Sequence, residues 1–147
     1  MPQYNQHINL LRIKAVATAL QELNENVVFV GGATVALYAD VQKSVEIRPT
    51  NDVDVIIELA SYKDYGNLDE RLRSIGFQND IESGIICRYK IQGIVVDVMP
   101  TTTDALGFSN RWYVDGFRNA IEHNLFEGFS VKIFSSTYFI ASKLEAH

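Results

Sequence analysis

The segment from Asp52 to Leu59, with the sequence DVDVIIEL, limits the possible folds of this chain more than any other stretch. Successive side chains of a β-strand point to opposite faces of its sheet. As a strand, the segment places four apolar residues on one face and three acidic residues on the other: Val53, Val55, Ile57 and Leu59, against Asp52, Asp54 and Glu58. We therefore expect a sheet with one buried face and a pair of carboxylates on the opposite face.

Residues 85–99 form a second strong pattern, which predicts a hairpin around Gln92-Gly93. A two-residue loop places Ile91 opposite Ile94 and Arg88 opposite Asp97. In this register one face is apolar and carries Cys87, Tyr89, Ile91, Ile94, Val96 and Val98. The other face carries Arg88, Lys90 and Asp97 beside Val95 and Met99. A slip by one residue would reverse both faces, so the pattern fixes the register.

The rest of the chain shows one continuous domain with no repeat, linker or low-complexity tract. Apolar spacing predicts helices over about 5–24, 33–41, 61–75, 112–123 and from residue 136 to the chain end, where Lys143 lies. Short strands are expected at 27–30 and 128–134, a loop at 42–51, and a helix stop at Gly76. Gly31-Gly32 then forms a turn between a strand and a helix.

Composition excludes several classes of protein. The chain has 147 residues, of which 47% are hydrophobic and 21% charged, as in a soluble globular domain. Its apolar runs are too short to span a bilayer and its N-terminus does not resemble a signal peptide, so we expect a cytoplasmic protein without a membrane partner. The net charge of −5 disfavours non-specific binding to duplex nucleic acid. The single cysteine, Cys87, is expected to be a buried small residue.

The chemistry of the chain is concentrated in its carboxylates. Asp52 and Asp54 project to the same side of a strand, where like charges repel. A basic neighbour, protonation or a divalent cation could relieve that repulsion, and hard oxygen ligands suit Mg²⁺. Asp97 supplies a third carboxylate if its hairpin joins the same sheet. Alone, an Asp-x-Asp pair is more often a solvated strand face than a metal site.

The Gly31-Gly32 turn offers close backbone approach and exposed N–H donors, which suit a phosphate group. Thr34 adds a hydroxyl near those donors. A glycine pair alone is weak evidence because turns use it widely. The full order is more restrictive: strand, glycine pair, helix, loop, Asp-x-Asp strand, helix, and a hairpin with a third aspartate.

That order resembles the nucleotidyltransferase superfamily. Four stretches look like those of its AbiEii-type members, namely 28–33 (VFVGGA), 48–54 (RPTNDVD), 96–100 (VDVMP) and 138–146 (YFIASKLEA). The resemblance implies an α+β, polymerase-β-like fold, a mixed sheet flanked by helices, over one domain at 1–147. Family members continue past the last stretch, so we expect this chain to lack their C-terminal helices.

The resemblance also implies site residues. Asp52, Asp54 and Asp97 would be catalytic and would hold one or two Mg²⁺ ions, while Gly31, Gly32, Thr34, Thr50 and Lys143 would bind the nucleotide. The activity implied is Mg²⁺-dependent transfer of a nucleoside monophosphate from an NTP to an acceptor, which could be a tRNA, a protein or a small molecule. Some members of the group are toxins of toxin–antitoxin pairs, so an antitoxin protein is an implied partner.

Other interpretations stay open. The chain could be a non-catalytic nucleotide-binding or interaction module with the same fold, or a glycosyltransferase, since Asp-x-Asp pairs serve there too; its short length disfavours the latter. Arg88 could pair with Asp97 across the hairpin or contact phosphate. Arg48 could contact phosphate or cover its loop. Glu58 lies too far along the strand to share a metal with Asp54.

Overall fold

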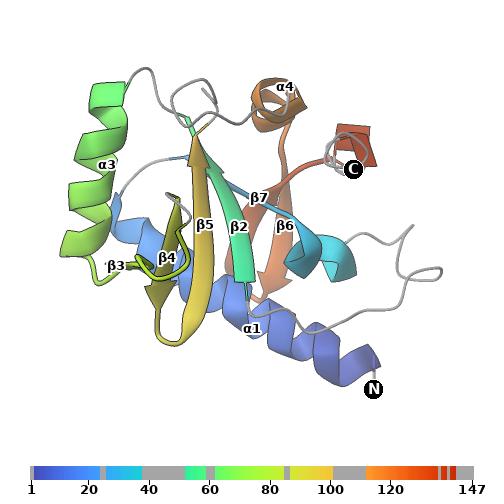
Figure 1. Cartoon of the computed structure of the whole chain (residues 1–147). Helices are drawn as coiled ribbons and strands as arrows, with labels where there is room; N and C mark the ends of the chain where they lie inside the picture. Colours follow the sequence, from blue (N-terminus) through green and yellow to red (C-terminus); the bar gives the residue numbers. More distant parts are fainter. Residues whose placement is uncertain are drawn as a thin grey trace.

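A computed structural model of the chain describes residues 2–23, 26–37, 52–58, 62–84, 87–100, 112–135, 137–138 and 140–141. These residues form a mixed α+β structure built on a seven-stranded sheet with the order β3-β4-β5-β2-β1-β7-β6. The strands are β1 (Val27–Val30), β2 (Asp52–Ile57), β3 (Gln78–Asn79), β4 (Arg88–Ile91), β5 (Ile94–Pro100), β6 (Ile121–Phe126) and β7 (Phe129–Ile133). The α-helices are α1 (Pro2–Leu20), α3 (Tyr62–Ser74) and α4 (Trp112–Arg118), with 3-10 helices η1 (Gln21–Leu23) and η2 (Gly32–Leu37). The arrangement is shown in Figure 1.

Strand β2 lies in the middle of the sheet. It pairs in parallel with β5 and antiparallel with β1. The register places Asp54 beside Asp97 on one side and beside Val30 on the other. Residues in register on neighbouring strands point to the same face, so the sheet itself brings the two aspartates together.

The face of the sheet opposite these aspartates is the core face, and its side chains pack against those of α1 and α3. Val53, Val55 and Val96 are fully buried there. Helix α1 contributes the buried Ile13 and Val16, and α3 contributes Leu68 and Leu72, to the same cluster. Figure 1 shows α1 crossing behind the sheet and α3 on the side of β3 and β4. These helices leave the aspartate face to other segments.

Polar contacts tie α3 to the rest of the molecule. The Tyr89 hydroxyl on β4 donates to Asp69 Oδ1 at 2.7 Å, and the Asn79 side chain donates to the same oxygen at 2.8 Å. The Arg71 guanidinium donates to the carbonyl of Leu23, at the end of η1. Although partial burial opposes it, these hydrogen bonds from Tyr89 and Asn79 hold the pKa of Asp69 below its usual value. Asp69 therefore stays ionised at neutral pH and anchors α3 to β3 and β4.

The hairpin of β4 and β5 confirms the predicted register residue by residue. Arg88 pairs with Asp97, Tyr89 with Val96, and Ile91 with Ile94. The two loop residues, Gln92 and Gly93, have φ angles of 50° and 77°, the left-handed pair that a two-residue turn with matching strand twist requires. Every residue assigned to the apolar face of the hairpin, including Cys87, is buried.

Two predicted elements differ in the structure. The helix expected over 112–123 ends at Arg118, and Ile121–Phe126 forms edge strand β6, which pairs antiparallel with β7 around Glu127 and Gly128. The backbone groups of this segment bond to β7, a partner that local spacing does not reveal. The helix expected from Ala33 to Val41 is a 3-10 helix over Gly32–Leu37, and residues 38–41 lie outside the described part of the chain. The expected loop at 42–51 also lies outside it.

The remaining elements agree closely with the sequence. The first helix begins at Pro2 and continues through η1 to Leu23, and the strand at 27–30 has the expected bounds. Gly76 follows α3 with a φ of 108°, which suits the residue that ends a helix. Among the described residues, no helix combines the length and apolar character needed to cross a membrane.

Candidate functional site

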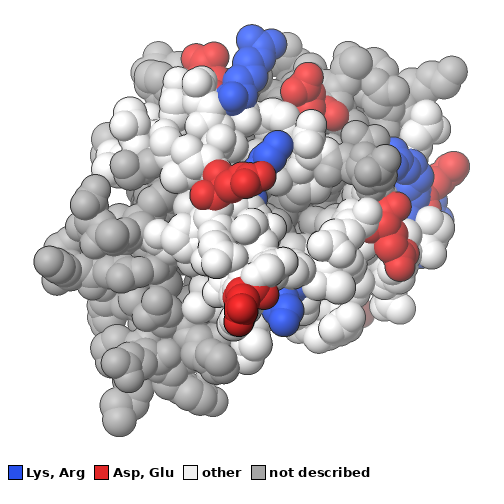
Figure 2. Space-filling model, turned by 180° about the vertical axis from the view of Figure 1, so that it is seen from behind, with Lys and Arg blue, Asp and Glu red and all other residues white. Residues whose placement is uncertain are grey.

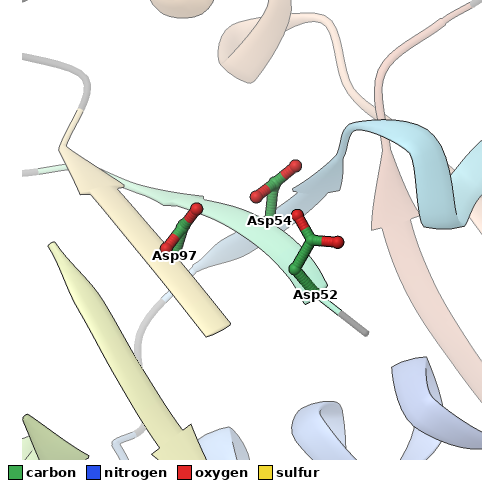
Figure 3. A group of neighbouring side chains, drawn as sticks. All are labelled: Asp52, Asp54 and Asp97. Carbon is green, nitrogen blue, oxygen red and sulfur yellow. The ribbon is translucent and has the colours of Figure 1, made fainter. Parts of the chain in front are cut away.

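Three aspartates converge on the face of the sheet that α1 and α3 leave uncovered. Asp52 and Asp54 come from β2 and Asp97 from β5, and one carboxylate oxygen from each lies within 4.8 Å of the other two. Figure 3 shows the three side chains on the same side of the two strands. The predicted convergence of these three residues is therefore confirmed. It follows from the i, i+2 spacing on β2 and the parallel register of β5.

The glycine turn closes directly against this cluster. Gly31 follows Val30, the β1 partner of Asp54, and has a φ of 80°. A methyl group at Gly31 would overlap Oδ2 of Asp54. From the sequence, the expected role of this glycine is to let the backbone approach a phosphate. The structure adds a second reason, which is that only glycine leaves room for the Asp54 carboxylate.

Asp54 is the electrostatic centre of the cluster. Burial, together with the negative charges of Asp97 and Asp52, raises its pKa from 3.8 to about 7, although Arg88 acts in the opposite direction. A hydrogen bond to Asp97 also favours the protonated form of Asp54. At neutral pH without a cation, Asp54 therefore carries a proton in a large fraction of molecules. A divalent cation would have to displace that proton.

Arg88 is the basic residue that faces the cluster from β4. Its Nε donates to Asp97 Oδ1 at 2.8 Å and its Nη2 donates to Oδ2 at 3.0 Å, so the guanidinium grips both oxygens. The predicted cross-strand pair of Arg88 and Asp97 is confirmed. Neighbouring Cys87 takes no part in ionic chemistry, because burial and the charge of Asp97 raise the pKa of its thiol to about 11.

The other residues predicted to bind the nucleotide are not members of the carboxylate cluster. Thr34 is fully buried, and its hydroxyl donates to the Gly31 carbonyl at 2.7 Å, so it holds the turn closed from within. Its backbone N–H donates to the same carbonyl at 3.1 Å. Gly32 follows Gly31 and begins η2. Thr50, Lys143 and Arg48 lie outside the described residues. Glu58 is exposed and is not part of the carboxylate cluster.

The donor set suits a hard divalent cation. Carboxylate oxygens are the ligands that Mg²⁺ prefers, and in its octahedral shell neighbouring oxygens lie about 3 Å apart and opposite ones about 4.2 Å apart. Three oxygens on one ion include at least two neighbouring pairs, so the carboxylates, which lie within 4.8 Å of one another, would close by up to about 1.8 Å in some pairs or share two ions. The mutual repulsion that raises the pKa of Asp54 would be relieved by such an ion. The residues present therefore fit the metal that the sequence implies.

Comparison of the chain with protein-family models and with curated proteins gives no match.

Proposed function

We propose that the chain is an Mg²⁺-dependent nucleotidyltransferase, which moves a nucleoside monophosphate from an NTP to an acceptor. The observation that carries this proposal is the convergence of Asp52, Asp54 and Asp97 beside the Gly31 turn. Three carboxylates next to a sharp glycine turn are the parts needed to hold a metal and a triphosphate together. The reaction itself comes from the resemblance of four sequence stretches to those of AbiEii-type nucleotidyltransferases.

In this function Asp52, Asp54 and Asp97 would hold Mg²⁺, which would neutralise charge on the phosphates and polarise the α-phosphate. The acceptor hydroxyl oxygen forms a bond to the α-phosphorus, and the bond from that phosphorus to the pyrophosphate oxygen breaks. The proton of the hydroxyl passes to solvent water, and pyrophosphate leaves. Most of the catalytic effect comes from positioning and charge, as in other phosphoryl transfers.

The glycine turn and the last helix have supporting roles in the proposal. The N–H groups at the start of η2 approach the phosphates, and Gly31 keeps the turn close to Asp54. Lys143 neutralises the triphosphate and Thr50 offers its hydroxyl beside the Asp-x-Asp pair; both roles come from the resemblance and stay predictions. Lys143→Ala should weaken nucleotide binding while leaving Mg²⁺ binding and stability unchanged.

The acceptor and the biological setting follow from the same resemblance. A toxin of a toxin–antitoxin pair would have a small antitoxin gene beside its own, so the neighbouring reading frame is the first place to look. A tRNA acceptor would need a local basic patch. On the face shown in Figure 2, the coloured Lys and Arg side chains lie beside Asp or Glu, so the described residues of this face form no such patch.

The test is a transfer assay with each NTP labelled at the α-phosphate, Mg²⁺, and total RNA or protein as acceptor. The proposal predicts labelled acceptor and release of pyrophosphate by the wild type. Asp54→Asn should abolish both, since the variant loses a metal ligand. Glu58→Gln is the matched control, because it removes an exposed carboxylate beyond the end of the same strand.

Two outcomes would count against the proposal. Nucleotide binding without pyrophosphate release, under conditions in which every acceptor pool has been supplied, would favour a non-catalytic nucleotide-binding module. Equal transfer by Asp54→Asn and the wild type would place the chemistry away from the carboxylate cluster.

A further inference from the structure

Arg88 holds Asp97 in a way that restricts how this carboxylate can bind a metal. Its Nε and Nη2 take one carboxylate oxygen each, at 2.8 and 3.0 Å. The two residues are direct partners across the β4–β5 hairpin, and the adjacent backbone bond from Val98 N–H to the Cys87 carbonyl, at 2.9 Å, holds the strands together there. The side chains are only 27% and 14% exposed, which shields the pair from water.

A two-pronged guanidinium bond and chelation by a metal compete for the same place. Both use the open end of the carboxylate, where its two oxygens point in a common direction. While Arg88 occupies that end, Asp97 can offer a metal one oxygen only, from the edge that faces the other aspartates (Figure 3). The arginine thus fixes Asp97 as a single-oxygen ligand.

This restriction affects divalent cations unequally. Mg²⁺ takes six ligands in a near-ideal octahedron at about 2.1 Å, which single oxygens and water satisfy, whereas Ca²⁺ takes about 6–8 oxygens and readily accepts chelating carboxylates. The positive charge of Arg88 does not discriminate, because both cations carry the same charge. The geometry of the Arg88–Asp97 bond does discriminate between the two cations, because it prevents Asp97 from chelating, and chelating carboxylates favour Ca²⁺.

We propose that Arg88 is a specificity-determining residue, which makes the carboxylate cluster prefer Mg²⁺ to Ca²⁺ by denying Asp97 the chelating mode. The inference rests on the proposed function only in placing a divalent cation at this cluster. Two properties of arginine can be tested apart, its positive charge and the planar guanidinium that binds both carboxylate oxygens. Lysine keeps the charge but lacks the planar guanidinium.

The experiment measures cation binding without any nucleotide. Bound Mn²⁺ is followed by electron paramagnetic resonance on the full chain and displaced with Mg²⁺ or Ca²⁺, which gives the ratio of the Ca²⁺ to the Mg²⁺ dissociation constant. The proteins are the wild type, Arg88→Met, Arg88→Lys and Lys90→Met. The last is the matched control, because Lys90 is an exposed cation of the same strand, two residues along, that pairs with Val95 and Gln78 in the sheet.

The ratio should fall in both Arg88 variants, so that Ca²⁺ gains on Mg²⁺, and stay at the wild-type value in Lys90→Met. Groups that orient a metal ligand typically change metal affinity by about 10–100-fold, and an effect on Ca²⁺ alone at the lower end of that range would lower the ratio about tenfold. If Arg88→Met does not fold, Arg88→Lys carries the test, since it preserves the charge and most of the chain length.

Two results would overturn the inference. If Arg88→Met changes the affinity for both cations by the same factor while Arg88→Lys resembles the wild type, Arg88 acts through charge alone and the inference is wrong. The proposed function survives that result. If the wild type binds no divalent cation, or binds it as well after Asp54→Asn, the metal site itself is wrong and the inference fails with it.

Discussion

Asp54 is the residue in which the fold and the proposed chemistry conflict. It lies among buried strand residues, and two other carboxylates stand within hydrogen-bonding or short electrostatic range. A group in this position stabilises the folded chain least when it is ionised, which is the state a metal ligand requires. The conflict is typical of functional sites, where stability is lost in favour of chemistry.

The first prediction concerns pH. The folded-state pKa of Asp54 is about 7, above the 3.8 of an ordinary aspartate, so the folded state binds the proton more tightly than the unfolded state. Its contribution to stability is complete below pH 3.8 and disappears as the pH rises through about 7. One pKa unit corresponds to about 1.4 kcal/mol, so between pH 5 and pH 8 the metal-free wild type should lose on the order of 2–3 kcal/mol relative to Asp54→Asn.

Urea denaturation of both proteins in EDTA, at intervals from pH 5 to pH 8, measures this difference. The free energy of unfolding of the wild type should fall relative to that of Asp54→Asn between pH 5 and about pH 7, and the two curves should run parallel above that, with Asp54→Asn the more stable. Comparing the variants cancels the histidines that titrate in the same range. A constant offset at all pH values would show that Asp54 does not titrate in this window.

The second prediction concerns Gly31. Gly31→Ala should destabilise the protein for two reasons. The φ of 80° disfavours a residue with a side chain, and the new methyl group meets the Asp54 carboxylate. A left-handed conformation costs a residue with a side chain roughly 1–2 kcal/mol, and the overlap adds to it. Gly93→Ala is the control, since its φ of 77° is similar but its added methyl group meets nothing within 4 Å. Equal losses in the two variants, measured by urea denaturation, would mean that Asp54 moves aside without cost.

At the scale of elements, the third prediction concerns the attachment of α3. Tyr89→Phe removes the 2.7 Å bond to the ionised Asp69 and leaves that carboxylate with one neutral donor fewer. Hydrogen bonds to charged groups contribute about 1.5–3 kcal/mol, so the free energy of unfolding should fall by about that amount. Arg73→Met, which breaks the exposed ion pair with Asp69 at 3.1 Å, should cost about 0.5 kcal/mol or less. If the order of the two losses is reversed, the Tyr89 bond does not anchor the helix.

The elements also show where sequence patterns succeed and where they fail. The register of the β4–β5 hairpin is predictable because alternate burial and the Gln92-Gly93 turn determine it together, within ten residues. Strand β6 is not, because Ile121–Phe126 is an edge strand with mostly exposed or half-buried side chains, and so it lacks a clear alternation. The Glu127-Gly128 turn, with a φ of 75° at the glycine, is the signal that could have indicated this second hairpin.

At the scale of the whole molecule, the triad is predictable for a topological reason. Its three residues lie on adjacent strands, and the face of each follows from period-two alternation once the strands are paired. What a pattern cannot supply is the contact between Gly31 and Asp54 or the two-pronged bond from Arg88. Both depend on distances set by β1 and β4 packing on either side of the central pair, β2 and β5.

A paired thermal melt tests most directly whether the carboxylate cluster is a metal and nucleotide site. The wild type and Asp54→Asn are melted alone and with Mg²⁺ and NTP. Ligand that binds only the folded state stabilises it by about 2.7 kcal/mol at a concentration 100 times the dissociation constant. The melting temperature of the wild type should therefore rise. Asp54→Asn should melt at or above the wild-type temperature without ligand and stay nearly unmoved with it. If Asp54→Asn instead melts well below the wild type without ligand, or shifts as far as the wild type with it, the carboxylate is a structural group and the proposed site is contradicted.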